Sequence, residues 1–232
     1  MKILAIETAT EACSAALLIS GEANQIEKNC VRFRHAPREH TKLILSMMDE
    51  VLEEAGTDLR EVDAIAFGRG PGAFTGLRIA SGIAQGVALS VGKPVVPVST
   101  LATLAQSVVD KLENDQSIIV ALDARMNEVY WGEFILNKGM LAIRGQEQVS
   151  PLQTLLDNMD TEQKIIAIGN GWEAYLADTP QNITQIKGSF PSAQQVAELA
   201  LPLLLSGNSL PPEGAQPVYI RNNVAEKPRK LS

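Results

Sequence analysis

The sequence is poor in the residues that most often bind metals or form disulfides. It has two cysteines and two histidines among 232 residues. Cys13 and Cys30 do not form a Cys-x-x-Cys pair, so neither a zinc site nor a dithiol centre is predicted. His35 and His40 are five positions apart, which does not place both rings on one helix face as ligands. The sequence therefore predicts no metal site.

Positive charge is also scarce. Lysine and arginine total 20 against 27 aspartates and glutamates, which gives a net charge of −7. An acidic chain is a poor autonomous binder of nucleic acid, because phosphate contacts need clustered basic residues. The densest basic patches are Arg32–Arg38 and Lys227–Lys230, and direct contact of either patch with RNA stays open.

Long apolar runs are missing as well. The longest candidate, Ile79–Val91, is interrupted by serine, glycine and glutamine, so no bilayer-spanning segment is predicted. Glu7 comes too early for the apolar region of a signal peptide. The hydrophobic fraction of 45% still supports a substantial core. We therefore expect a cytoplasmic protein without a membrane contact.

The most informative stretch present is GRGPGAFTGLR, from Gly68 to Arg78. It follows a predicted strand, Val62–Phe67, and opens a predicted helix, Thr75–Val91. A strand, a glycine turn and a helix N-terminus can form a backbone pocket for an anion. The same glycines can instead allow a helix to pack very close to its neighbour. The turn alone favours neither interpretation.

The predicted helix behind this turn carries two adjacent rows of small residues. One row is Gly76, Ala80, Ala84 and Ala88, and the other is Gly82, Gly86 and Ser90. Interior glycines cost a helix roughly 1 kcal/mol each, so some close contact must offset that cost. The rows favour the packing interpretation, in which the turn delivers a helix that docks against another helix.

The order of predicted elements repeats. The first unit has strands at Lys2–Glu7, Ser14–Ile19 and Gln25–Val31, and a helix at Pro37–Ala55. A second meander follows with strands near residues 118–122, 128–136 and 141–148, then helices at 151–159 and 192–205. We therefore expect an α/β protein with two related subdomains, the second degraded. The predicted division is 1–100, 101–209 and an extended, proline-containing tail, 210–232.

Five segments carry a family resemblance. They are Ile6–Thr10, Arg38–His40, Gly68–Arg78, Asp123–Tyr130 and Pro217–Arg221. In order and content they resemble the bacterial TsaB family, within the actin, hexokinase and heat-shock-chaperone superfamily. The resemblance implies two actin-like (ribonuclease-H-like) subdomains. It also implies a partner subunit that works with TsaD and the ATPase TsaE. That system transfers threonylcarbamoyl from threonylcarbamoyl-adenylate to N6 of the adenosine next to the anticodon, in tRNAs reading codons that start with adenine.

Two departures from the catalytic relative TsaD indicate a non-catalytic chain. Thr100 and Leu104 stand where TsaD has its metal-binding histidines, and neither can replace an imidazole. Asp123–Met126 stands where TsaD has a glycine-rich phosphate loop, so side chains replace glycines there. We predict no catalytic residue and no cofactor held by this chain alone. Glu7, Thr8 and Arg78 are weak candidates for a nucleotide site shared with TsaD.

We expect the helices Thr41–Ala55 and Thr75–Val91 to form the surface that binds TsaD. The same self-complementary face could give a homodimer when TsaD is absent, and tRNA would be met mainly through the complex. The predicted partner-binding residues are Leu45, Met48, Leu52, Gly76, Ile79, Ala80, Ile83, Ala84 and Val87.

Several alternatives stay open. An autonomous ATPase or kinase of the same superfamily could use acids such as Glu7 and Asp123. A peptidase has no serine, histidine and aspartate set to support it. His40, with Arg38 and Glu39, could cap or pack a helix start or contact TsaD or RNA. Arg78 could anchor an internal carboxylate or a nucleotide phosphate. The role of Arg125 is open in the same way.

Overall fold

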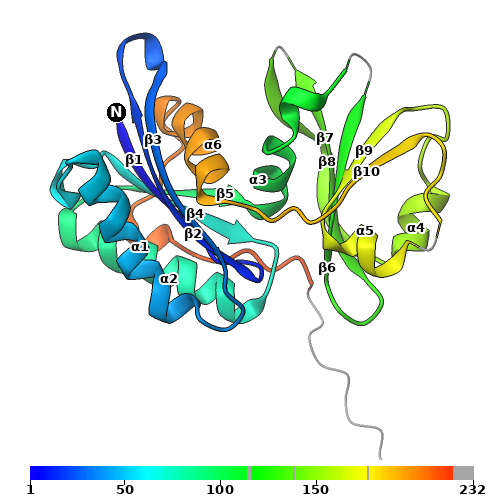
Figure 1. Ribbon diagram of the computed structural model, residues 1–232, viewed down its shortest axis with the longest axis horizontal. Coiled ribbons are helices and arrows are strands. Elements are labelled where there is room, and N and C mark those ends of the chain that lie inside the picture. Colours follow the sequence, from blue (N-terminus) through cyan, green and yellow to red (C-terminus); the bar gives the residue numbers. More distant parts are fainter. Residues whose placement is uncertain (114–115, 138, 177, 222–232) are drawn as a thin grey trace, which may run out of the picture.

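The computed structural model describes residues 1–113, 116–137, 139–176 and 178–221. Within these residues the chain forms two five-stranded sheets with helices on both faces of each, and Figure 1 shows the sheets side by side with a short helix, α3, between them. The expected α/β class with two subdomains is confirmed. Residues 222–232 of the predicted tail, including its basic patch, lie outside the described residues.

The first sheet has the strand order β3-β2-β1-β4-β5. Its first three strands form an antiparallel meander, and β4 and β5 continue the sheet in parallel with β1. Helices α1 and α2 cover one face, and α6 covers the other. The strands are β1 (Lys2–Glu7), β2 (Ala12–Ser20), β3 (Ile26–His35), β4 (Ala64–Gly70) and β5 (Val95–Ser99), and the helices are α1 (His40–Ala55), α2 (Phe74–Val91) and α6 (Ala193–Leu205).

The second sheet has the order β10-β9-β6-β7-β8, which repeats the topology of the first. Helix α3 covers one face, and the short helices α4 and α5 cover the other. The strands are β6 (Ser117–Asp123), β7 (Val129–Asn137), β8 (Met140–Ser150), β9 (Ile165–Ile168) and β10 (Ile183–Ile186), and the helices are α3 (Thr100–Gln106), α4 (Leu152–Asp157) and α5 (Asn170–Tyr175). Because α4 and α5 have six residues each, against 16 and 18 in α1 and α2, the second copy is the degraded one.

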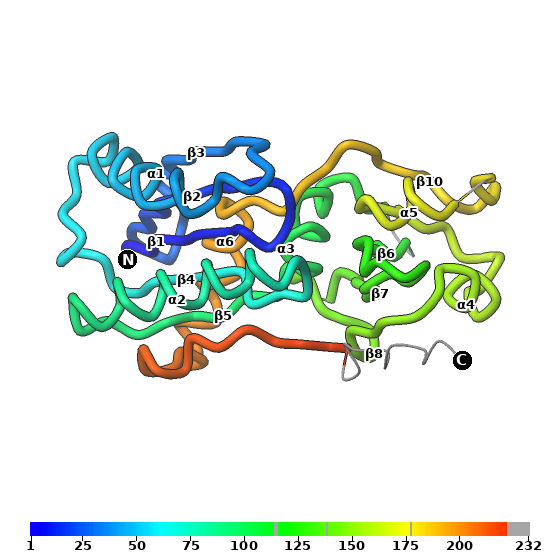
Figure 2. The backbone as a smooth tube through the Cα atoms, turned by 90° about the horizontal axis from the view of Figure 1, so that it is seen from below, coloured from blue at the N-terminus to red at the C-terminus, as the bar shows by residue number. Residues whose placement is uncertain are grey.

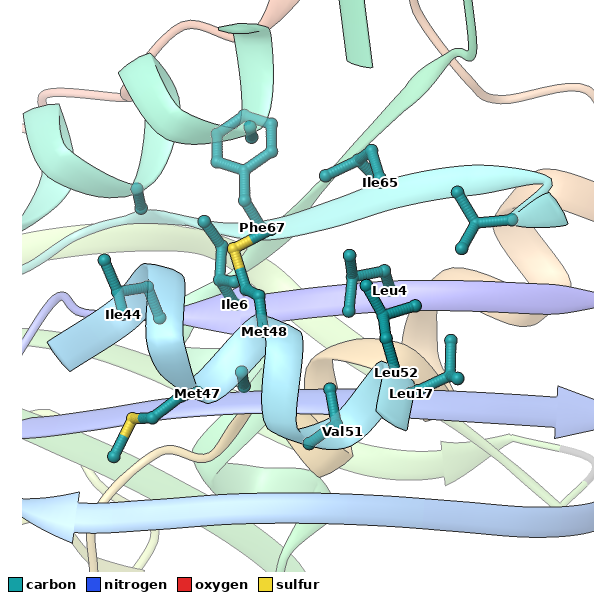
Figure 3. Packing of buried hydrophobic residues seen from close by; sticks show 14 of the residues in the cluster. Leu4, Ile6, Leu17, Ile44, Met47, Met48, Val51, Leu52, Ile65 and Phe67 are labelled. Atoms are coloured by element: carbon teal, nitrogen blue, oxygen red, sulfur yellow. The ribbon is translucent and has the colours of Figure 1, made fainter. Parts of the chain in front are cut away.

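The core of the first subdomain lies between its sheet and α1. Figure 3 shows side chains of α1 pointing toward those of β1, β2 and β4. On α1 the labelled residues are Ile44, Met47, Met48, Val51 and Leu52, and on the strands they are Leu4, Ile6, Leu17, Ile65 and Phe67. The helical spacing of these apolar residues in the sequence is therefore the spacing of a face that packs on its own sheet.

Three predicted boundaries differ from the structure. The helix α1 begins at His40 rather than Pro37, because Arg38 has a left-handed φ of 68° that a right-handed helix excludes. Helix α3 ends at Gln106 rather than near Leu112. Helix α6 packs on β1, β2 and β4 of the first sheet, although the predicted division assigned it to the second unit. Short elements at residues 170–175 and 183–186 were not predicted as a helix and a strand.

Helix α2 corrects one expectation about length. At 18 residues it is long and apolar enough to cross a membrane by length and composition alone. Six of its residues are buried in the protein, and the buried alanines belong to the core between α2 and the first sheet. Packing within the chain therefore accounts for much of its apolar character.

Candidate docking face and nucleotide-loop site

The two rows of small residues on α2 face opposite environments. Gly76, Ala80, Ala84 and Ala88 are buried, and the three alanines belong to the core shared with β4 and α1. A Cβ atom at Gly76 would stand 2.0 Å from the carbonyl oxygen of Thr8. The prediction that Gly76, Ala80 and Ala84 meet a partner is corrected, because this row packs inside its own chain.

The other row faces outward. Gly82, Gly86 and Ser90 are exposed, and a Cβ built at Gly82 or Gly86 meets no described atom within 4 Å. Packing within the described chain does not require glycine at these two positions, although each costs the helix about 1 kcal/mol relative to alanine. An exposed row of small residues lets another helix approach closely, so this row is the better candidate for a docking face.

Apolar side chains of α2 flank the outer row, because Ile79, Ile83 and Val87 on the same helix are half-buried. On α1, Leu45 is 54% exposed. We define the outer α1–α2 face as Leu45, Ile79, Gly82, Ile83, Gly86 and Val87.

The other two predicted docking residues on α1 do not reach this face. Met48 is 3% exposed and Leu52 is 8% exposed, and both lie in the core under α1. Met47 is also buried in that core.

The candidate nucleotide-binding residues of the first loop make their hydrogen bonds within the chain. Glu7 is fully buried, and its carboxylate accepts hydrogen bonds from the backbone N–H of Ala9 at 2.7 Å and the hydroxyl of Thr100 at 3.2 Å. Burial raises the pKa of Glu7 to about 7, while these hydrogen bonds partly oppose the shift. The hydroxyl of Thr8 donates to the carbonyl oxygen of Gly76 at 2.8 Å.

The glycines of the Gly68–Gly76 turn are explained by close approach. A Cβ at Gly68 would stand 2.0 Å from the Glu7 carboxylate, and one at Gly72 would stand 2.4 Å from the carbonyl oxygen of Ala9. Gly68 in β4 thus leaves room for the buried Glu7 side chain, and Gly72 leaves room for the β1–β2 turn to lie against the start of α2. This geometry supports the packing interpretation over the anion pocket.

Thr100 and Leu104, the positions to which the family resemblance assigns the metal-binding histidines of the catalytic relative, are both fully buried. Thr100 donates to Glu7, and Leu104 packs in the core of the second sheet. Across the described ranges, no three His, Cys, Asp or Glu side chains are grouped so that they could hold a metal ion.

The second loop is a tight turn built from side chains. Asp123 accepts hydrogen bonds from the Tyr175 hydroxyl at 2.8 Å and the Arg125 backbone N–H at 2.7 Å, and its carboxylate pairs with the Arg125 guanidinium at 3.0 Å. The hydrogen bond from the Tyr175 hydroxyl to Asp123 is the main cause of the raised pKa of Tyr175. The next two residues, Met126 and Asn127, share the left-handed φ of Arg125. Arg125 therefore closes the turn, and its side chain is 82% exposed.

His40 and Arg78 have contacts that the sequence left open. The Nε2 atom of His40 lies 2.9 Å from the carbonyl oxygen of Thr10 and 3.2 Å from that of Ala12, so it fastens α1 to the β1–β2 turn. Arg78 meets no internal carboxylate in the described structure. Its guanidinium lies 3.8 Å from the centre of the Phe74 ring, and its Nε donates to the Tyr219 hydroxyl at 3.3 Å. The contact with Tyr219 was not predicted, because Tyr219 and Arg78 are 141 positions apart. Phe74 was not predicted either, although its position four residues before Arg78 on the same helix was a signal in the sequence.

Known proteins match this chain over nearly its whole length. The family model described as TsaD, tRNA N6-adenosine threonylcarbamoyltransferase, matches residues 20–227. The tRNA threonylcarbamoyladenosine biosynthesis protein TsaB of Haemophilus influenzae is 38% identical, covering 98% of this chain and 96% of that protein. The TsaB protein of Escherichia coli strain K12 is 39% identical, covering 98% and 97%.

A solved structure matches nearly the whole chain, and a transferase matches part of it. YeaZ from Pseudomonas aeruginosa superposes with a TM-score of 0.82 at 37% identity, covering 94% of this chain and 99% of that chain. The tRNA N6-adenosine threonylcarbamoyltransferase of Chlorobaculum tepidum is 34% identical over a shorter stretch, covering 43% of this chain and 31% of that protein.

Proposed function

This chain belongs to the TsaB family of tRNA threonylcarbamoyladenosine biosynthesis proteins, and on that premise we propose that it is a non-catalytic docking subunit for TsaD. In this role it supports transfer of threonylcarbamoyl from threonylcarbamoyl-adenylate to N6 of the adenosine next to the anticodon. The ATPase TsaE is the third member of the system, tRNA is met through the complex, and the site of action is the cytoplasm.

The observation that carries this proposal is the outward row of small residues on α2. Gly82 and Gly86 lie open between the half-buried side chains of Ile79, Ile83 and Val87. A helix of the partner can approach the glycines closely and bury the flanking aliphatic groups, which provides a hydrophobic driving force. The same face can pair two copies of this chain when TsaD is absent.

The loop contacts support a role without catalysis. The side chains of Glu7 and Thr8 are hydrogen-bonded inside the protein, to Ala9, Thr100 and Gly76. The second loop exposes side chains at the place where a phosphate would need backbone N–H groups. An ATPase or kinase needs both loops open to a nucleotide, so the geometry does not favour that alternative.

The test is a binding measurement with purified TsaD. Gly86→Trp places a bulky side chain in the outer row, and we expect at least a tenfold loss of affinity for TsaD. Leu205→Trp is the matched control, because Leu205 is 48% exposed at the end of α6, on the opposite face of the first sheet.

The two variants separate the outcomes. Full TsaD binding by Gly86→Trp, with an unchanged melting temperature, would contradict docking through this face. Calorimetry of the isolated chain with ATP and magnesium gives an independent check. Micromolar binding with turnover would contradict the non-catalytic role.

A further inference from the structure

The two subdomains are joined by two chain crossings. One is the step from β5 to α3 at Ser99, and the other is the segment from β10 to α6, residues 187–192. Two crossings of this kind allow hinge motion unless other contacts oppose it. Besides these crossings and the hydrogen bond from Thr100 to Glu7, two further sets of contacts span the subdomains, and one of them includes Ser99 itself.

The first set begins at a bulge in β8. The register of β7 and β8 shifts between Trp131 and Glu133, opposite residues 144–148, and Gly145 in this stretch has a φ of 84°. A bulge re-aims the side chains next to it. Here the Glu147 side chain accepts hydrogen bonds from two residues of the first subdomain, Ser99 and Arg69. The distance from Arg69 Nη2 to Glu147 Oε2 is 3.3 Å.

These contacts are shielded from solvent. The Glu147 side chain is 11% exposed and that of Arg69 is 26% exposed. An ion pair in such a position is screened by salt much less than a pair on the open surface. Arg69 belongs to the first subdomain and Glu147 to the second, so the pair acts directly on their relative orientation.

The second set of contacts is made by the chain segment that follows α6. Figures 1 and 2 both show it, in orange to red, running along the first subdomain toward the second. The Val218 N–H donates to the carbonyl oxygen of Arg69 at 2.8 Å. The ring of Tyr219 lies 5.5 Å from that of Phe74 on α2.

The segment then reaches the second subdomain. Arg221 pairs with Glu128, the residue before β7, and its guanidinium lies 6.0 Å from the centre of the Tyr130 ring. Only 12% of the Arg221 side chain is exposed. Tyr219 and Arg221, two positions apart, thus contact opposite subdomains.

A cavity beside these contacts shows why they matter. It has a volume of about 370 Å³ and lies between the subdomains, with Arg69, Ser99 and Glu147 at its polar side and Phe134 and Ile143 among its apolar walls. Close apolar packing therefore does not fill this part of the interface. At this place directional polar contacts, rather than close apolar packing, connect the two subdomains.

We infer that Arg69, Ser99 and Glu147, together with the segment 218–221, form a clamp that holds the two subdomains in one orientation in the isolated chain. Arg69 is the shared member, because its side chain binds Glu147 and its carbonyl oxygen binds Val218. The glycine-rich turn around Arg69 thereby connects the start of α2 to the second subdomain. The clamp does not depend on the docking role proposed above.

The test measures the distance between the subdomains in the full chain. Spin labels at Thr41→Cys on α1 and Thr184→Cys on β10 report it by pulsed electron resonance, because both threonines are exposed while Cys13 and Cys30 are buried. We expect a single narrow distance distribution in the labelled chain. Adding Glu147→Ala and Arg221→Ala should at least double its width.

The matched control removes an ion pair within one subdomain. Lys2→Ala with Glu61→Ala breaks a pair within the first subdomain whose atoms lie 2.5 Å apart, and it should leave the distribution unchanged. An unchanged width in the folded Glu147→Ala, Arg221→Ala chain would overturn the inference. A broad or two-peaked distribution in the labelled chain before these changes would also overturn it, whether or not the double variant folds.

Discussion

Thr8 and Gly76 join the β1–β2 turn to the first turn of α2. The Thr8 hydroxyl donates to the Gly76 carbonyl oxygen at 2.8 Å, and a Cβ at Gly76 would stand 2.0 Å from the Thr8 carbonyl oxygen. The glycine is therefore required by the backbone of a residue 68 positions away. At its helical end, the glycine-rich segment therefore allows α2 to pack closely against the β1–β2 turn.

We predict opposite effects for the same substitution at two glycines of α2. Gly76→Ala forces the β1–β2 turn and the helix apart and should lower the free energy of unfolding by about 3 kcal/mol. Gly86→Ala meets no described atom within 4 Å and should raise it by about 1 kcal/mol through helix propensity. Urea unfolding followed by circular dichroism measures both. Equal effects at the two positions would contradict the assignment of inner and outer rows.

A second prediction concerns two predicted docking residues on α1. Met48→Ala opens a cavity in the core and should cost about 2–5 kcal/mol of folding free energy. Leu45→Ala changes a side chain that is 54% exposed and should stay within about 0.5 kcal/mol. Leu45→Ala should nevertheless weaken TsaD binding, measured by calorimetry. Loss of stability without loss of binding in Leu45→Ala would remove this residue from the docking face.

The pH dependence of stability should carry the signature of Glu7. Burial raises its pKa from 4.5 to about 7 in the folded chain, so between these values the folded state binds more protons than the unfolded state. The contribution of Glu7 to stability is therefore fully present below about pH 4.5 and is lost as the pH rises through about 7. The loss amounts to about 3 kcal/mol at 1.36 kcal/mol per pKa unit.

Glu7→Gln tests this assignment. Glutamine keeps an acceptor for the Ala9 N–H but does not ionise, so the variant should gain stability relative to the native chain as the pH rises from 5 to 8. Glu22→Gln, at an exposed glutamate, is the control and should leave the pH profile unchanged. Parallel profiles for the native chain and Glu7→Gln would contradict the raised pKa.

The sequence predicted what local periodicity determines. The repeated meander and the apolar stripe of α1 follow from spacing along the chain, and both are confirmed. The inner side of α2 could not be predicted, because two adjacent rows of small residues are equivalent until the sheet is in place. The clamp could not be predicted either, because Arg69 and Glu147 are 78 positions apart and meet only through a bulge. Distance along the chain and backbone geometry, rather than residue type, set these limits.

The last prediction concerns the strained turn after β6. Met126 has a left-handed φ of 57°, which costs a residue with a Cβ roughly 1–2 kcal/mol and costs glycine almost nothing. Met126→Gly should therefore raise the free energy of unfolding by up to about 1 kcal/mol, even though the methionine side chain is lost. Met140 is the matched control, because it is similarly exposed (62% against 61%) but lies in strand β8. Met140→Gly should lower stability by about 0.5–1 kcal/mol, since glycine weakens a strand. If both substitutions are destabilising to the same extent in urea unfolding, the turn does not carry the strain that its backbone angles indicate.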